Sequence, residues 1–253
     1  MNIALKVFVV VLAYLIGSIN MATIISKLKG KNIKKLGSGN PGTMNVLRSI
    51  GKGWGALTFA FDSVKGLVFA LIGRFAIDGG STDWMFILGT VVVLGHIFPL
   101  YTNFKGGKGV ATSIGVFIVA SPIVGAIVLV GLVIYLLLCK IGFIGSYLAI
   151  TALTITSCIL YGQSVIAVVC CLIIWVLVIV RHKDNVIRFI HGKENTLSIV
   201  GKNQVKEFDD NGEEIKAETK ADGENTEDSA PSEISESDIK DDKESQSEIQ
   251  KEN

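Results

Sequence analysis

The chain has 253 residues, 49% of them hydrophobic, and a formal net charge of +1. Of its 24 basic residues 17 precede position 201 and 7 follow, whereas of its 23 acidic residues 5 precede and 18 follow. This asymmetry excludes one uniform soluble domain. We expect residues 1–200 to form a membrane domain and residues 201–253 to form an acidic, disordered tail without a core.

The four cysteines lie in or beside apolar segments, with no CxxC pattern and no histidine at a metal-ligand spacing. They are Cys139, Cys158, Cys170 and Cys171. Buried cysteines of this kind behave as small hydrophobic residues. The sequence therefore indicates neither a disulfide framework nor a zinc site.

Long apolar segments predict membrane-spanning helices. The first, Ile3–Ile25, exceeds the roughly 7–15-residue apolar core of a signal peptide, so we interpret it as a retained span. Gly55–Ile77 and Trp84–Phe98 predict the next two spans. Phe143–Leu160 and Val165–Val180 predict the last two.

Between them, the segment Val110–Leu138 is too long for one ordinary crossing. Its 29 residues would reach about 43 Å as a helix, against a hydrocarbon core of about 30 Å. Lys140 and the basic cluster at Arg181 lie on the same side as the other basic loops only if the segment crosses twice. We therefore predict two short helices with a turn near Ser121–Pro122.

Positive charge orients the resulting seven spans, because cytoplasmic loops carry the excess of lysine and arginine. Most of these residues lie in four loops, at 27–53, 99–109, around 140 and after 181. Three other loops contain none: 78–83, near 121 and 161–164. We predict an all-α integral membrane protein with its N-terminus outside, its C-terminus cytoplasmic and its active site at the cytoplasmic face. Lys6 is the one charge that does not fit.

The first polar stretch, GSGNPGTMNVLR, places hydrogen-bond donors among glycines. Its arginine is a planar, permanently charged fork that suits phosphate oxygens. Its serine and asparagines are neutral donors that orient an anion or polarise a carbonyl. An ordinary turn capped by serine and asparagine is the alternative interpretation. The candidate site residues are Gly37, Ser38, Gly39, Asn40, Asn45 and Arg48.

The second polar stretch, GHIFPLYTNFKGGKGVAT at Gly95–Thr112, predicts a phosphate cradle at the membrane surface. Glycines permit turns that point successive N–H groups at one anion, and a following helix N-terminus favours the same charge. The nucleotide-binding pattern GxxxxGK[ST] is absent. A glycine-rich membrane loop with positive-inside lysines is the alternative. The candidates are Lys105, Gly106, Gly107, Lys108 and Gly109.

His96 lies at the inner end of the third span, beside this stretch. A histidine there is either a hydrogen-bonded packing residue or a base, and we retain it as a candidate site residue. Asp62 and Lys65 are three residues apart within the second span. Charges inside the bilayer usually pair or face a polar cavity, so we interpret these two as an ion pair that supports the site.

The third polar stretch is RHKDNVIRFIHGKE, at Arg181–Glu194. If the last helix continues past the membrane, His182, Asn185 and Arg188 share one face by i, i+3 spacing. A basic helix end that touches anionic lipid is the alternative. Glu194 closes the stretch and is a further candidate.

Several chemistries are absent from the sequence. Before the tail, the predicted cytoplasmic loops contain only Asp184 and Glu194 as carboxylates, too few to predict a divalent-metal site. No serine elbow has a His/Asp pair, and no histidine has an acid five residues on. What remains is a set of anion-binding loops at a lipid interface. That arrangement suits a phosphorylated water-soluble reactant that meets a lipid-soluble one.

The three stretches, in this order and spacing, resemble the motifs of one family, the bacterial acyl-phosphate:glycerol-3-phosphate acyltransferases (PlsY type). The resemblance covers roughly residues 3–197 and includes the seven-span layout. It implies transfer of a fatty acyl group from acyl phosphate to glycerol 3-phosphate, giving 1-acylglycerol 3-phosphate and inorganic phosphate in the bacterial inner membrane. It implies no metal, no organic cofactor and no nucleic-acid partner. Functional coupling to an acyl-phosphate-forming enzyme is a further expectation.

The resemblance also implies roles for individual residues. Ser38 and Arg48 are expected to be essential, and the glycine-rich stretch is similar to the family's glycerol 3-phosphate site. His182, Asn185 and Glu194 belong to the active site or to its support. We expect direct attack of the glycerol hydroxyl on the acyl carbon, without an acyl-enzyme.

Two other functions fit the same loops. The first is a transporter of a phosphorylated metabolite, although no pair of repeated halves with midplane charges is evident. The second is a scaffold that binds partners through the acidic tail.

Overall fold

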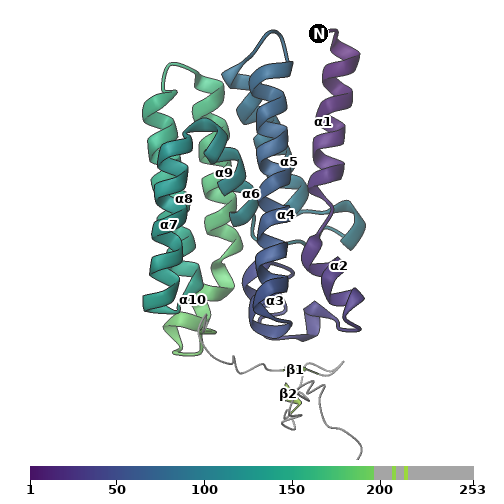
Figure 1. Ribbon diagram of the computed structural model, residues 1–253, viewed down its shortest axis with the longest axis vertical. Helices are drawn as coiled ribbons and strands as arrows, with labels where there is room; N and C mark the ends of the chain where they lie inside the picture. Colours follow the sequence, from purple (N-terminus) through teal and green to yellow (C-terminus); the bar gives the residue numbers. More distant parts are fainter. Residues whose placement is uncertain (197–206, 209–213, 216–253) are drawn as a thin grey trace, which may run out of the picture. The chain divides into compact units, whose positions relative to one another are not determined.

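The computed structural model describes residues 1–196, 207–208 and 214–215 (Figure 1). Within the described residues, every regular element up to Ile190 is a helix. Two short strands, β1 (Glu207–Phe208) and β2 (Glu214–Ile215), then pair antiparallel. The tail that we predict to be disordered, residues 201–253, otherwise lies outside the described residues.

Helices occupy almost all of the membrane domain. They are α1 (Ile3–Gly17), α2 (Met21–Leu28), the 3-10 turn η1 (Ile33–Lys35), α3 (Thr43–Ser49), α4 (Lys52–Leu71), the π turn η2 (Ile72–Ala76), α5 (Thr82–Ile97), the 3-10 turn η3 (Leu100–Thr102), α6 (Val110–Ala120), α7 (Pro122–Cys139), α8 (Gly142–Leu160), α9 (Val165–Arg181) and α10 (Lys183–Ile190).

Among the residues that the structure describes, four stretches of helix can cross a membrane by length and composition: α4 with η2, α5 with η3, α7 and α8. The number rises to 6 if two bent pairs each count as one span, α1 with α2 (40°) and α9 with α10 (42°). The apolar helix α6 is shorter, at 11 residues. Together these segments correspond to the seven predicted ones, while the number of crossings and their direction remain predictions.

The predicted turn within Val110–Leu138 is confirmed. Helix α6 ends at Ala120, and Pro122 opens α7, where its fixed φ and missing N–H are tolerated. Val110, at the start of α6, lines the same cavity as Leu136, near the end of α7. The two helices therefore run in opposite directions.

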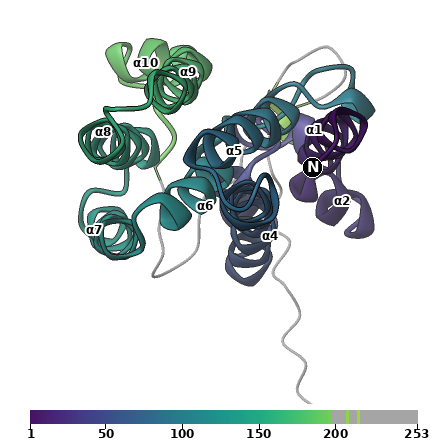
Figure 2. The same cartoon turned by 90° about the horizontal axis from the view of Figure 1, so that it is seen from above.

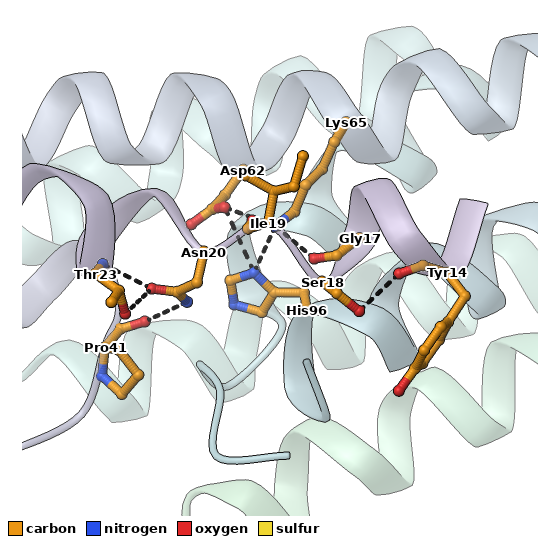
Figure 3. Close-up of polar contacts among 10 residues, drawn as sticks. All are labelled: Tyr14, Gly17, Ser18, Ile19, Asn20, Thr23, Pro41, Asp62, Lys65 and His96. Carbon is orange, nitrogen blue, oxygen red and sulfur yellow. Dashed lines mark hydrogen bonds and ion pairs between the residues drawn. The ribbon is translucent and has the colours of Figure 1, made fainter. Parts of the chain in front are cut away.

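The first predicted span is divided into two helices, which the sequence did not indicate. Helix α1 ends at Gly17 and α2 begins at Met21. The carbonyl oxygens of Gly17 and Ile19 accept hydrogen bonds from Lys65 Nζ at 3.0 and 2.9 Å (Figure 3). Because the last carbonyls of a helix lack partners within it, a buried ammonium group stabilises this break.

Helices α4, α5 and α6 pack together, and α1 contacts α5 on one side while α9 contacts it on the other (Figure 2). Glycines allow the close approach of α4 and α6. A Cβ on Gly115 would lie 1.9 Å from the carbonyl oxygen of Ser63, and one on Gly66 would lie 2.1 Å from that of Thr112. Small residues at such positions let two membrane helices pack backbone to backbone.

The three loops without basic residues lie at the same end of the bundle as the N-terminus (Figure 1). The Tyr161 hydroxyl donates to Ala120 O at 2.6 Å, and the Ser164 hydroxyl donates to Asp83. Lys6, the exception to the predicted charge pattern, forms an ion pair with Asp78 in the connector between α4 and α5. Its charge is thus compensated within this end of the domain.

Candidate active site

In the first polar stretch, the Asn45 side chain holds the loop together. Its Nδ2 donates to Leu36 O at 2.8 Å and to Ile33 O at 3.3 Å, and its Oδ1 accepts from Ser38 N at 3.1 Å. Gly37 has a φ of +54°, and a Cβ there would lie 2.5 Å from Asn45 Oδ1. Asn45 and Gly37 thus fix the position of Ser38.

Arg48 reaches the site from α3, and its side chain is buried. Its Nε donates to Thr196 O at 3.0 Å and its Nη2 donates to Asn195 O at 3.3 Å. The guanidinium fork therefore connects the first polar stretch to the segment that follows the third. A single-point cation has no such two-pronged geometry.

The glycine-rich stretch folds back against the end of α5. Gly106 N donates to Ile97 O and Gly107 N donates to His96 O, both at 3.2 Å. A Cβ on Gly106 would lie 2.2 Å from His96 O, and one on Gly107 would lie 2.2 Å from His96 Nε2.

The expectation that these two N–H groups point at an anion is therefore wrong. The last carbonyls of α5 have no partners within the helix, and the N–H groups of Gly106 and Gly107 satisfy them. The predicted helix start is confirmed: Gly109, at a φ of +86°, caps α6. Positive charge in this stretch comes from Lys105 and Lys108.

The third polar stretch bends by 42° where α9 meets α10, at His182. The His182 Nδ1 lies 2.8 Å from Val178 O, and the ring packs edge-on against Tyr147 at 5.3 Å between centroids. A carbonyl only accepts, so Nδ1 carries the proton and neutral His182 keeps a lone pair on Nε2.

Glu194 holds the polar groups of α10 in place. Asn185 Nδ2 donates to Glu194 Oε1 at 2.6 Å, and Arg188 Nε donates to Glu194 Oε2 at 3.1 Å. Asn185 Oδ1 in turn accepts a hydrogen bond from Lys108 Nζ, which joins the second stretch to the third.

These three stretches surround two adjoining cavities. The larger, of about 310 Å³, has a polar end and an apolar end. Its apolar walls come from α4, α7 and α8, and include Ala56, Phe59, Leu129, Leu132, Val133, Leu136 and Phe143.

The smaller cavity, of about 260 Å³, is strongly basic. Its charged lining consists of Lys34, Lys105, Lys108, Arg181, Asp184 and Arg188. Three residues line both cavities: Ser38, Asn40 and Lys108. A reactant in one cavity therefore meets a reactant in the other at these three side chains.

Most of the predicted site residues line a cavity. The larger contains Ser38, Asn40, Asn45, Arg48, His96, Lys108, Gly109, His182, Asn185 and Glu194. The smaller contains Ser38, Gly39, Asn40, Lys105, Gly106, Lys108 and Arg188. Gly37 and Gly107 are in the lining of neither cavity and act through the contacts already described. We predicted that His182, Asn185 and Arg188 share one face. In the structure, His182 and Asn185 line the larger cavity, whereas Arg188 lines the smaller one.

Three residues of the smaller cavity were not predicted as site residues: Lys34, Arg181 and Asp184. Arg181 Nη2 donates to Gly106 O at 3.1 Å and so connects α9 to the glycine-rich stretch. Lys34 lies in the basic loop after α2, where one lysine among several carries no distinguishing pattern. Arg181 and Asp184 stand in the third polar stretch, but outside the series of His182, Asn185 and Arg188.

Burial lowers the pKa of Lys108 to about 8, from 10.5 for an ordinary lysine. Among neighbouring charges, Arg188 and Arg181 contribute to this lowering, whereas Glu194 and Asp184 oppose it. The residue at the junction of the cavities therefore changes its charge near physiological pH.

The predicted ion pair of Asp62 with Lys65 is confirmed, with 2.8 Å between Oδ1 and Nζ. It lies at the break between α1 and α2 (Figure 3), and its Asp62 also lines the larger cavity. Asn20, at that break, donates from Nδ2 to Pro41 O at 3.0 Å and caps α2 by accepting from Thr23 N. The break thereby supports the first polar stretch.

Comparison with known proteins is consistent with this geometry. A family model described as glycerol-3-phosphate acyltransferase matches residues 7–192. The glycerol-3-phosphate acyltransferase of Aquifex aeolicus is 38% identical over 196 residues, which is 74% of this chain and 97% of the relative. That of Thermoanaerobacter pseudethanolicus is 38% identical over 192 residues, which is 76% of this chain and 95% of the relative.

Two crystal structures of PlsY, an integral membrane glycerol 3-phosphate acyltransferase, are similar over 76% of this chain and 95% of theirs, at 34% identity. The glycerol 3-phosphate form has a TM-score of 0.70, and the lysophosphatidic acid form has one of 0.67. Sequence, helical arrangement and the joined polar stretches thus lead to one conclusion. The chain belongs to the glycerol-3-phosphate acyltransferase family.

Proposed function

We propose that this protein transfers a fatty acyl group from acyl phosphate to glycerol 3-phosphate, at the cytoplasmic face of a bacterial plasma membrane. The products are 1-acylglycerol 3-phosphate and inorganic phosphate. One observation carries the proposal: a basic cavity adjoins a largely apolar one, and Ser38, Asn40 and Lys108 line both. The relatives named for glycerol 3-phosphate support the acceptor.

In this arrangement, glycerol 3-phosphate occupies the smaller cavity. Lys34, Lys105, Arg181 and Arg188 surround it with positive charge, and arginine forks suit phosphate oxygens. The one carboxylate in the lining, Asp184, is available to accept a hydrogen bond from a glycerol hydroxyl.

The acyl phosphate occupies the larger cavity. Its chain lies along the apolar walls of α4, α7 and α8, which remove it from water. Its phosphate lies at the polar end, beside Ser38, Asn40 and Arg48. The acyl carbon then stands at the junction, where the acceptor hydroxyl reaches it.

An acyl phosphate is a mixed anhydride with a good leaving group, so positioning and charge stabilisation supply most of the catalysis. The glycerol hydroxyl oxygen bonds to the acyl carbon, the bond from that carbon to the phosphate oxygen breaks, and phosphate leaves with the electron pair. Lys108, which lines both cavities, binds the phosphate of glycerol 3-phosphate and stabilises the leaving charge. The proton goes to His182 Nε2 or to a phosphate oxygen.

The test is turnover by the purified full-length protein with acyl phosphate and glycerol 3-phosphate. We expect equal amounts of phosphate and lysophosphatidate, and no product when acyl-CoA replaces acyl phosphate. Turnover with acyl-CoA would overturn the donor, and binding of glycerol 3-phosphate without turnover would favour transport. A trapped acyl adduct on Ser38 would overturn direct transfer.

Acyl phosphates hydrolyse in water, so we also propose functional coupling to an enzyme that makes them. Added acyl-phosphate-forming enzyme should raise the rate above that obtained with the same steady concentration of free acyl phosphate. An equal rate would argue for uptake from solution or from the membrane.

A further inference from the structure

His96 contacts the ion pair of Asp62 and Lys65 and, like Asp62, lines the larger cavity. It ends α5, is only 3% exposed, and contributes to the cavity lining. Its Nδ1 lies 3.0 Å from Lys65 Nζ and 3.5 Å from Asp62 Oδ1. In Figure 3 the other ring nitrogen, Nε2, points away from both charged groups.

The hydrogen bonds of Lys65 determine what Nδ1 does. An ammonium group has three protons and no lone pair. Lys65 Nζ makes three hydrogen-bond contacts, to Gly17 O, Ile19 O and His96 Nδ1. Both carbonyls accept, and the remaining proton is shared between Nδ1 and Asp62 Oδ1, which lies 2.8 Å from Nζ. A proton on Nδ1 would face that ammonium proton at 3.0 Å, so Nδ1 is an acceptor.

Asp62 keeps Lys65 charged. Its Oδ1 lies 2.8 Å from Nζ, and both groups are buried. A neutral lysine would leave this carboxylate without a counter-charge in the interior, which is costly. The alternative arrangement, in which Nδ1–H donates to an uncharged amine, is therefore disfavoured. Donation from Nδ1–H to Asp62 Oδ1 is disfavoured too, because that oxygen is 3.5 Å away while the Lys65 ammonium group is at 3.0 Å.

A neutral imidazole that accepts through Nδ1 carries its proton on Nε2. Gly107 leaves room at that nitrogen, since a Cβ at position 107 would lie 2.2 Å from it. The ring therefore presents an N–H donor beside the glycine-rich stretch. His182 is held in the opposite state, because its Nδ1 donates to Val178 O.

We infer that Asp62 and Lys65 fix His96 in the Nε2–H tautomer, so that His96 donates a hydrogen bond to an oxygen of the bound acyl phosphate and does not take the proton of the glycerol hydroxyl. This inference rests on the proposed function for the identity of the ligand. In it Lys65 is a positioning residue, which acts through His96.

The tautomer can be measured without any activity. The full-length protein labelled with ¹⁵N-histidine would be studied by NMR in lipid nanodiscs. It has 3 histidines, and the signal missing in His96→Gln belongs to His96. We expect one protonated nitrogen, Nε2, and one unprotonated nitrogen, Nδ1. A proton on Nδ1, or on both nitrogens, would overturn the assignment.

The role of Lys65 requires a variant that leaves no buried charge unpaired. The double variant Asp62→Asn/Lys65→Met removes both members of the ion pair, and its melting temperature shows whether it folds. We expect the His96 signals of a folded double variant to show both tautomers. If the Nε2–H form persists alone, Lys65 does not set it.

Turnover measurements distinguish whether His96 acts as a hydrogen-bond donor or as a base. In His96→Gln the side-chain amide keeps an N–H near Nε2 but cannot take up a proton, whereas His96→Leu has neither function. One preorganised donor is worth about 10²–10³-fold in kcat, so we expect that loss in His96→Leu and a loss of about tenfold or less in His96→Gln. Equal losses in the two variants would identify a base.

The pH profile provides the control for this comparison. The charged groups that face His96 are Asp62 and Lys65 from α4 and Arg181 from α9. If His96 donates, its replacement by glutamine leaves the acidic limb of kcat/KM where it is. If His96 is the base, that limb disappears. Absence of turnover in the unmodified protein would refute the proposed function and leave the NMR assignment standing.

Discussion

At the scale of single residues, Arg48 connects distant parts of the chain through two hydrogen bonds from one planar group. Lysine in its place keeps the charge but not the fork. A lost hydrogen bond to a charged group costs about 1.5–3 kcal/mol, so we expect Arg48→Lys to lower kcat/KM by about 10–100-fold.

The matched control for this substitution is Arg74→Lys. Arg74 lies in η2, at the other end of the domain, and donates to Thr82 Oγ1 at 2.6 Å. It should change kcat/KM little. Near-normal activity of Arg48→Lys would refute the proposed role of the fork.

The titration of Lys108 should make kcat/KM depend on pH. Its pKa of about 8 means that the ammonium form, which binds phosphate, predominates below pH 8 and is lost as pH rises through it. We expect kcat/KM for glycerol 3-phosphate to fall above pH 8. Bound phosphate raises the pKa of its partner, so kcat at saturation should fall less.

Lys108→Arg tests this assignment, because a guanidinium stays charged throughout the range. The fall above pH 8 should be absent from its profile, even if its activity is lower. A fall that persists in Lys108→Arg would belong to another group.

The limits of sequence reasoning at this scale come from hydrogen bonds that only the folded chain reveals. Ser38, Arg48 and Lys108 were identifiable because their chemistry suits phosphate. Asn45 has a suitable side chain too, but the folded loop uses both of its amide atoms. The N–H groups of Gly106 and Gly107 are likewise occupied, by the end of α5.

At the scale of helices, the contact of α4 with α6 depends on the missing side chain of Gly115. A methyl group there meets Ser63 O at 1.9 Å, so α4 and α6 must separate. Overpacking costs about 1–3 kcal/mol, which corresponds to a fall of about 2–12 °C in the melting temperature of Gly115→Ala.

Gly131→Ala is the matched control, because a Cβ on Gly131, within α7, meets nothing within 4 Å. Alanine has the higher helix propensity, so this variant should melt at the same temperature or slightly above. Equal melting temperatures for Gly115→Ala and Gly131→Ala would show that the two helices are not closely packed.

Apolar segments predicted most helix positions, since burial in lipid imposes a minimum length and excludes charge. Pro122 also predicted where α7 begins, because proline is favoured at the first position of a helix. The division between α1 and α2 was not predictable, because Lys65 from another helix stabilises it. A break that depends on a tertiary contact leaves no local pattern.

At the scale of the whole chain, the membrane domain contains every part of the site described above. The family match ends at residue 192, and the last residue that contacts Arg48 is Thr196. We expect truncation after Val200 to leave kcat and KM unchanged in a membrane-reconstituted assay. Loss of activity in a truncated protein that still folds would give the acidic tail a role in catalysis.

The basic cavity illustrates why a site is harder to predict than a fold. Lys34, Lys105 and Arg181 are far apart in sequence, and each resembles any other lysine or arginine near the end of an apolar segment. The fold brings them together through contacts such as that of Arg181 with Gly106. The spacing of residues within one stretch does not show which distant side chains the fold brings together.

Helix α7 has only one buried residue, Gly125, yet it supplies a wall of the larger cavity. On that side, α7 alone separates the larger cavity from the surroundings of the protein. With the acyl chain along this wall, as proposed, we expect the finished lysophospholipid to pass sideways into the bilayer when α7 tilts. Stiff or thick membranes should hence slow turnover by delaying departure, while the chemical step proceeds as before.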